Sequence, residues 1–241
     1  MAIDHTTFWV ALVQIIGVNL VLSGDNAVVI ALAARSLPSS QQGRAIFWGS
    51  GAAVVMRIIL TVVAVEMLRL PYLKLIGAAL LLWIGVKLLL PEDDGDDDAK
   101  LNSGPTMMAA IRTILIADLV MSLDNVIAVA AAAKGSLLLL ILGLAISIPL
   151  VIFGSTLLLK IMQRFPVVIT LGAGLLGWVA GEMAVTDPIV TDSFESLPWL
   201  HTLAPLAGAA FVVAIGKWRG VARAEAQTSA EAATQNRSSH D

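Results

Sequence analysis

Two copies of a short polar motif interrupt apolar stretches of this sequence. Ser23, Gly24, Asp25 and Asn26 form the first copy, and residues 122–125, Ser-Leu-Asp-Asn, form the second. If these stretches cross a membrane, each central charge costs about 2.5 to 3.5 kcal/mol, so the carboxylates need protons, basic partners or a bound cation. Carboxylate and amide oxygens are the ligands that Mg²⁺, Ca²⁺ and Mn²⁺ prefer. The motifs therefore predict a site for a divalent cation.

The charges within these stretches do not balance. Asp25 and Asp124 are the acids of the two motifs, and Asp118 is a third acid shortly before the second motif. Arg57 is the basic residue that lies at a similar depth within an apolar stretch. This excess of acids is what a divalent cation would neutralise. We expect Arg57 to neutralise or gate the site rather than to bind substrate.

Helical spacing places further polar residues beside the acids. Each copy has three polar residues at positions i, i+4 and i+7, on one face of a helix: Asn19, Ser23 and Asn26, then Asp118, Ser122 and Asn125. On an ideal helix, Asp25 and Asp124 point about 100° away from the adjacent asparagine. Either the Asp and the Asn sides of each helix both face the interior of the helix bundle, or the helix unwinds there and its backbone carbonyls become available as ligands. Gly24 favours a break in the first copy, whereas Leu123 favours a straighter helix in the second.

Several of these polar residues have simpler explanations. Three of them fit interhelical hydrogen bonds as well as metal ligation: Asn19, Ser23 and Ser122. Glu66 precedes Arg69 by three residues, so an interfacial ion pair explains it at least as well as a role in the site. Glu182 lies near the end of an apolar stretch and is equally open. The doubled Asp-Asn pairs favour function more strongly than any of these residues.

The composition indicates an all-α polytopic membrane protein. The chain has 241 residues, of which 58% are hydrophobic and 14% are charged, and its mean hydropathy is +0.87. Its apolar runs reach the roughly 20 residues that a transmembrane helix needs, and they do not alternate as barrel strands do. The absence of cysteine excludes disulfides and thiolate metal sites. We expect the lipid bilayer, and not nucleic acid, to be its partner.

The apolar stretches predict seven transmembrane helices. They cover about 8–34, 45–68, 73–90, 107–133, 137–159, 167–185 and 203–218. The expected organisation is a first three-helix repeat over 1–90, an acidic linker over 91–105, a second three-helix repeat over 106–185, a loop and seventh helix over 186–219, and a disordered tail over 220–241.

An internal repeat relates the two halves. The motif at 23–26 aligns with 122–125, and residues 70–85 align with 165–180. The second alignment matches three pairs of residues: Pro71 with Pro166, Gly77 with Gly172, and Trp83 with Trp178. Because each repeat has an odd number of spans, the second enters the membrane from the opposite side. A 3+3 inverted repeat of this kind is typical of alternating-access transporters with a site at the membrane midplane.

The distribution of Lys and Arg predicts the orientation. Basic residues flank the first, third and fifth loops and follow the last span, whereas the opposite side carries Arg69, Lys74 and Lys134. By the positive-inside rule the N-terminus is expected outside and the C-terminus in the cytoplasm. We expect a multi-pass protein of the bacterial inner membrane.

The two motif segments also resemble a known family. Residues 19–35 (NLVLSGDNAVVIALAAR) and 118–135 (DLVMSLDNVIAVAAAAKG) look like the paired signatures of TerC-type integral membrane proteins, in the YjbE-like branch. The segments 56–68 and 176–183 are similar to the second and sixth spans of that family, so the resemblance covers about 8–219. Members are regarded as manganese exporters within the superfamily of LysE-like exporters, and some are linked to tellurite resistance.

The resemblance implies a ligand set. Asp25, Asn26, Asp124 and Asn125 would be metal ligands, with Asp118 and Glu66 as contributors. This sequence has Asn19 where its second repeat has Asp118, so the need for both acids is open.

Three functions compete at this stage. The first is a secondary transporter, not an enzyme, that exports Mn²⁺ from the cytoplasm in exchange for H⁺, with manganese as substrate and no cofactor. The second is a proton- or Na⁺-coupled exporter of an amino acid or small metabolite. The third, intramembrane aspartyl proteolysis by Asp25 and Asp124, is disfavoured because both are followed by Asn, as in a ligand set. A homo-oligomer, the metal and the coupling ion stay open.

Overall fold

The described part of the chain is all helical. The computed structural model describes residues 9–10, 12–17, 24–67, 72–90, 106–132, 136–194 and 199–238, and no strand occurs among them. The helices are α2 (Gly24–Arg35), α3 (Ser39–Met67), α4 (Leu73–Leu89), α5 (Met107–Ala132), α6 (Leu137–Arg164), α7 (Val167–Val185), α8 (Pro188–Phe194) and α9 (Leu200–Ser238). Residues 9–10 and 12–17 are helical as well. The all-α class is confirmed.

Within the described residues, four helices are long and apolar enough to cross a membrane. These segments are Ser39–Thr61 in α3, Leu138–Arg164 in α6, Val167–Val185 in α7 and Leu200–Ala222 in α9. By contrast, α2 has 12 residues within the described part of the chain, or about 18 Å at 1.5 Å per residue. The longer α5 carries Arg112, Asp118 and Asp124 among its apolar residues. The structure supports a membrane protein, and the seven-span arrangement stays a prediction.

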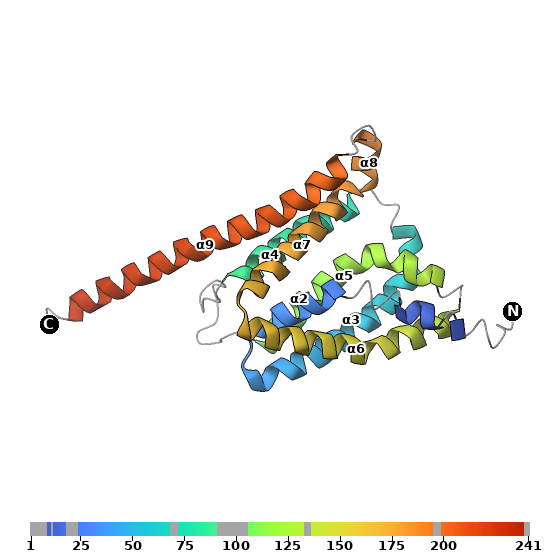
Figure 1. Cartoon of the computed structure of the whole chain (residues 1–241), viewed down its shortest axis with the longest axis horizontal. Helices are drawn as coiled ribbons and strands as arrows, with labels where there is room; N and C mark the ends of the chain where they lie inside the picture. Colours follow the sequence, from blue (N-terminus) through green and yellow to red (C-terminus); the bar gives the residue numbers. More distant parts are fainter. Residues whose placement is uncertain are drawn as a thin grey trace.

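The helices form two groups that lie side by side (Figure 1). One group contains α2, α3, α5 and α6, where α3 packs against α5 and α2 packs against α6. The other contains α4, α7 and α9, where α7 packs against both α4 and α9. One core of buried apolar side chains joins the groups, with Ile114 of α5, Leu81 of α4 and Leu176 of α7 among its members. The site described below lies in the first group.

Two matched glycines bring α4 and α7 close to the helices that carry the motifs. A Cβ atom on Gly77 of α4 would lie 2.8 Å from Val120 Cγ1 of α5. A Cβ atom on Gly172 of α7 would lie 2.7 Å from Val28 Cγ1 of α2. Both separations are shorter than real side chains allow, so each position requires glycine unless its neighbour moves.

Helices α7 and α9 approach each other through small residues. A Cβ atom on Gly177 would collide with the carbonyl of Gly208, and one on Gly181 would collide with the carbonyl of Ala204. Because these obstacles are backbone atoms, they cannot rotate away. Glycine at a four-residue interval is the usual means by which membrane helices reach backbone contact. The pair therefore fixes α9 on the second group of helices.

Replacing Gly181 with alanine is expected to destabilise the protein. The new methyl group would lie 2.7 Å from Pro205 Cα, and overpacking of this kind costs about 1 to 3 kcal/mol. Gly174→Ala on the same helix is the matched control, because its methyl group would meet Val213 Cγ2 at 3.4 Å. Thermal unfolding in detergent, followed by size-exclusion chromatography, should show a lower Tm for Gly181→Ala alone. Equal Tm values for the two variants would contradict this account of the contact.

The sequence predicts a helix break near Gly24 in the first motif and a straighter helix at Leu123 in the second. Helix α5 runs without interruption through Leu123, as the sequence predicts. Helix α2 begins at Gly24. Residues 18–23, where the predicted break would fall, lie outside the described residues.

The C-terminal segment differs from the sequence-based expectation. A disordered tail was expected over 220–241, whereas α9 continues to Ser238. The segment is too polar to bury a core, but it is rich in Ala, Glu, Gln and Arg, which favour helix when no packing is available. Once α9 has formed in the bundle, each further residue adds to an existing helix and needs no new nucleus. The acidic linker at 91–105 lies outside the described residues.

Candidate cation site

A buried ion pair joins α3 to α5. The Arg57 guanidinium on α3 donates through Nη2 to Asp118 Oδ1 on α5. Both residues lie well inside their helices, and their exposed fractions are 4% and 6%. The pairing follows from the close packing of α3 on α5. The one deep base of the sequence therefore meets one of the three deep acids.

Ser122 closes a network around this pair. Arg57 Nε donates to Ser122 Oγ at 2.9 Å, and Ser122 Oγ donates to Asp118 Oδ2 at 3.2 Å. Asp118 and Ser122 are one turn apart on α5, so both side chains face α3. The Ser122 side chain is fully buried. Ser122 therefore makes the interhelical hydrogen bond that the sequence allows, and its role as a ligand stays a prediction.

Asp25 adds a second acid from a third helix. It lies in the first turn of α2, where its Oδ1 accepts a hydrogen bond from the Asn26 backbone N–H at 2.8 Å. Helix α2 packs against both α3 and α5, so Asp25 lies on the same group of helices as Arg57 and Asp118 and interacts electrostatically with them. The N-terminal end of a helix also stabilises a carboxylate through the helix dipole. Helices α2, α3 and α5 therefore meet at a site with two described acids and one base.

The asparagines of the motifs flank this site. Asn26 follows Asp25 on α2 and is buried, with 4% of its surface exposed. Asn125 lies one turn beyond Ser122 on α5 and is partly buried. Both amides thus come from the two helices that carry the acids, as the aligned motifs predict.

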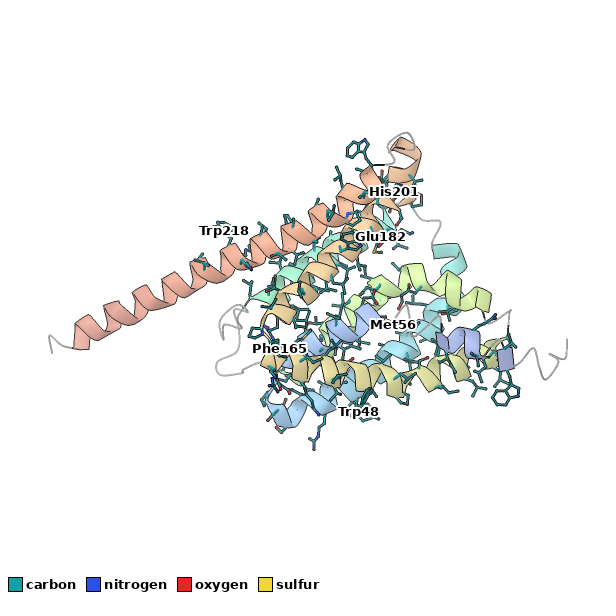
Figure 2. The ribbon with its side chains drawn as sticks, viewed as in Figure 1. Trp48, Met56, Phe165, Glu182, His201 and Trp218 are labelled. Atoms are coloured by element: carbon teal, nitrogen blue, oxygen red, sulfur yellow. The ribbon has the colours of Figure 1, made fainter. Side chains whose placement is uncertain are left out.

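The remaining predicted residues fall into two groups. Glu182 is exposed on α7 and lies near His201, at the end of α7 where α9 begins (Figure 2). Met56, which precedes Arg57, lies in the other group of helices, so Glu182 and Arg57 come from different groups (Figure 2). Asn19 and Ser23 lie outside the described residues, as do the side chains of Glu66 and Asp124.

The described side chains do not by themselves form a metal cluster. Among them, no group of three or more His, Cys, Asp or Glu residues is arranged to hold a metal ion. Asp25 and Asp118 supply two carboxylates, and Asn26 and Asn125 supply amides from the same two helices. The acid that would complete the set in the sequence prediction is Asp124, whose side chain is not described.

One buried acid has a role that the sequence did not reveal. Asp187 is fully buried between α7 and α8. Its carboxylate accepts hydrogen bonds from backbone N–H groups at the start of α4, including Lys74 at 3.2 Å, and from Ile189 in α8 at 3.1 Å. An Asp followed by Pro188 at the first position of a helix is an N-cap signal. This signal predicts that Asp187 caps α8. The hydrogen bonds from α4 to Asp187 depend on the tertiary fold and are not predictable from the local sequence.

Comparison with known proteins identifies the family of this chain. The integral membrane protein TerC family matches residues 4–224, which include all three acids and Arg57. The chain belongs to the TerC family. The predicted resemblance is therefore confirmed.

Relatives of this TerC family protein are membrane proteins. The uncharacterized membrane protein YjbE of Bacillus subtilis strain 168 is 42% identical over 206 residues, which cover 86% of this chain and 93% of YjbE. The UPF0053 inner membrane protein YgdQ of Escherichia coli strain K12 is 24% identical over 202 residues, which cover 78% of this chain and 82% of YgdQ. No solved structure gives a significant match.

Proposed function

We propose that this TerC family protein is a secondary transporter that exports a divalent metal cation, with Mn²⁺ as its substrate, from the cytoplasm. The observation that carries the proposal is the meeting of α2, α3 and α5 around Asp25, Asp118 and Arg57. Arg57 pairs with Asp118, and the half-buried Asp25 adds a second negative charge beside this pair. Buried acids in excess inside a membrane protein mark ion pathways.

The oxygen donors at the site suit a hard or borderline cation. The proposed ligands are carboxylates and amides: Asp25, Asn26, Asp118, Asp124 and Asn125, with Asn19 and Glu66 as further contributors. Such ligands favour Mg²⁺, Ca²⁺ or Mn²⁺ over Cu⁺. The choice of manganese among them rests on the family resemblance.

The packing of the helices supports an inverted repeat. The proposed repeats pair α2 with α5, α3 with α6 and α4 with α7. Under this pairing, the contact of α3 with α5 in one half corresponds to the contact of α6 with α2 in the other. The structure has both contacts. The exchanged helices also run in opposite directions along the bundle (Figure 1). Alternating access by movement of one repeat against the other would then expose the site to either side.

The basic residues support the proposed orientation. At the end of the bundle where α2, α4 and α6 finish and α3 and α5 begin, the described basic residues include Arg35, Arg44, Lys87, Arg112, Lys160, Arg164 and, on α9 beside the end of α4, Lys217 and Arg219. Among the described residues, Lys74 lies at the opposite end, at the start of α4. By the positive-inside rule the first end is cytoplasmic, in a bacterial inner membrane.

Expression of the chain in a bacterial strain without manganese exporters tests the proposal. We expect growth at toxic manganese concentrations to recover and the manganese content of the cells to fall, because export removes the ion from the cytoplasm. Asp25→Asn is the matched inactive variant. Unchanged growth and manganese content, with the protein present in the membrane, would contradict the proposal. Protection against an amino acid instead of manganese would favour the metabolite exporter.

A further inference from the structure

The Arg57 guanidinium is paired with Asp118, the carboxylate that the cation would use. Asp118 Oδ1 accepts a hydrogen bond from Arg57, and Asp118 Oδ2 accepts one from Ser122, which itself accepts from Arg57. All three side chains are buried. A cation bound to Asp118 would lie beside the guanidinium charge, and like charges repel strongly in an interior of low dielectric constant.

We propose that Arg57 is a tethered competitor of the transported cation. It pairs with Asp118 when the site is empty, and it leaves Asp118 when the cation binds. Arg57 is thus a positioning residue that sets the affinity and release of the cation, and not a ligand. This inference rests on the proposed function, and it adds to that function the means by which the empty site keeps Asp118 neutralised.

The two halves differ in this respect. Arg57 lies within α3, whereas the basic residues of α6, its proposed counterpart, are Lys160 and Arg164 near the end of that helix. The arginine therefore acts from one repeat on the motif helix of the other, across the contact of α3 with α5. Movement of one repeat against the other would change this contact. The ion pair is placed where binding of the cation can be coupled to that movement.

Competition has a measurable consequence. If Arg57 and the cation exclude each other from Asp118, removing the guanidinium strengthens cation binding by the coupling factor, which is typically about 5- to 150-fold. The same change leaves Asp118 without this counter-charge in the metal-free site, which slows the return of the metal-free, proton-loaded carrier. Arg57→Gln is therefore expected to lower both the KM for Mn²⁺ and the maximal rate of transport.

The test compares Mn²⁺ binding by the purified full-length chain with Mn²⁺ flux in proteoliposomes. Arg112→Gln is the matched control, because it removes an exposed arginine from α5. Arg57→Gln should bind Mn²⁺ more tightly, and Arg112→Gln should bind as the wild type does. In an Asp118→Asn background, Arg57→Gln should no longer strengthen binding, because the competition acts through Asp118. A folded Arg57→Gln protein with unchanged or weaker binding would overturn the inference.

A second variant keeps the test decisive if Arg57→Gln does not fold. Arg57→Lys retains the charge but loses the planar guanidinium that contacts Asp118 and Ser122 together. It should bind Mn²⁺ more tightly than the wild type, with a smaller gain than complete removal would give. Unchanged or weaker binding by folded Arg57→Lys would overturn the inference.

The wild-type arm separates this inference from the proposed function. Wild-type flux together with no gain in affinity on changing Arg57 overturns the role of Arg57 and leaves manganese export in place. Absence of both Mn²⁺ binding and flux in the wild type overturns the proposed function, and the competition with it.

Discussion

Asp118→Asn is expected to abolish Mn²⁺ transport and to destabilise the protein. The change removes a proposed ligand and also the carboxylate that accepts the hydrogen bond from the buried Arg57 guanidinium. Breaking one side of a buried ion pair typically costs about 3 to 5 kcal/mol. Flux in proteoliposomes and thermal unfolding in detergent measure the two effects separately.

A double variant separates stability from transport. Arg57→Gln combined with Asp118→Asn removes both charges, so part of the lost stability should return while transport stays absent. Glu182→Gln is the control, because Glu182 is exposed on α7, in the group of helices that does not carry the pair (Figure 2). It should change neither property. A folded Asp118→Asn protein with the flux of the wild type would remove Asp118 from the site.

Asp25→Asn is expected to abolish transport with little effect on stability. The asparagine carbonyl can still accept the hydrogen bond from the Asn26 backbone N–H, and Asn and Asp serve similarly at the start of a helix. The negative charge at the site is lost, however. Loss of a residue that only holds a metal ligand in place lowers metal affinity or activity about 10- to 100-fold. Loss of a ligand itself should therefore reduce the flux by at least this factor.

The comparison that checks this prediction is the initial rate of manganese flux at equal amounts of reconstituted protein. Glu182→Gln again serves as the control for loss of an acid. Asp25→Asn protein with the Tm of the wild type and a flux within a factor of two would show that Asp25 is not a ligand.

The helices were largely predictable because apolar runs end at recognisable residues. The run predicted over 167–185 matches α7 (Val167–Val185), which begins directly after Pro166. The run predicted over 137–159 stops short of α6 (Leu137–Arg164), because Lys160, Gln163 and Arg164 at its end are polar but still favour helix. An apolar run marks the part of a helix that is buried in lipid or in the core. The helix itself can continue past the end of that run.

The composition of the site was predictable in part, and its pairing was not. The count of deep charges indicates that Arg57 neutralises acids, but three acids are available in the sequence. The packing of α3 on α5 selects Asp118 and adds Ser122. Asp187 shows the same limit, because its N-cap signal is local whereas its bonds to α4 depend on the tertiary fold.

Flux of radiolabelled manganese in proteoliposomes tests the central claim most directly. The wild-type chain should move manganese across the membrane, and an imposed pH gradient should drive its accumulation on the acidic side, as exchange for H⁺ requires. Asp25→Asn vesicles should retain no more flux than vesicles without protein. The account would be contradicted if wild-type vesicles showed no manganese flux above protein-free vesicles, with or without the gradient.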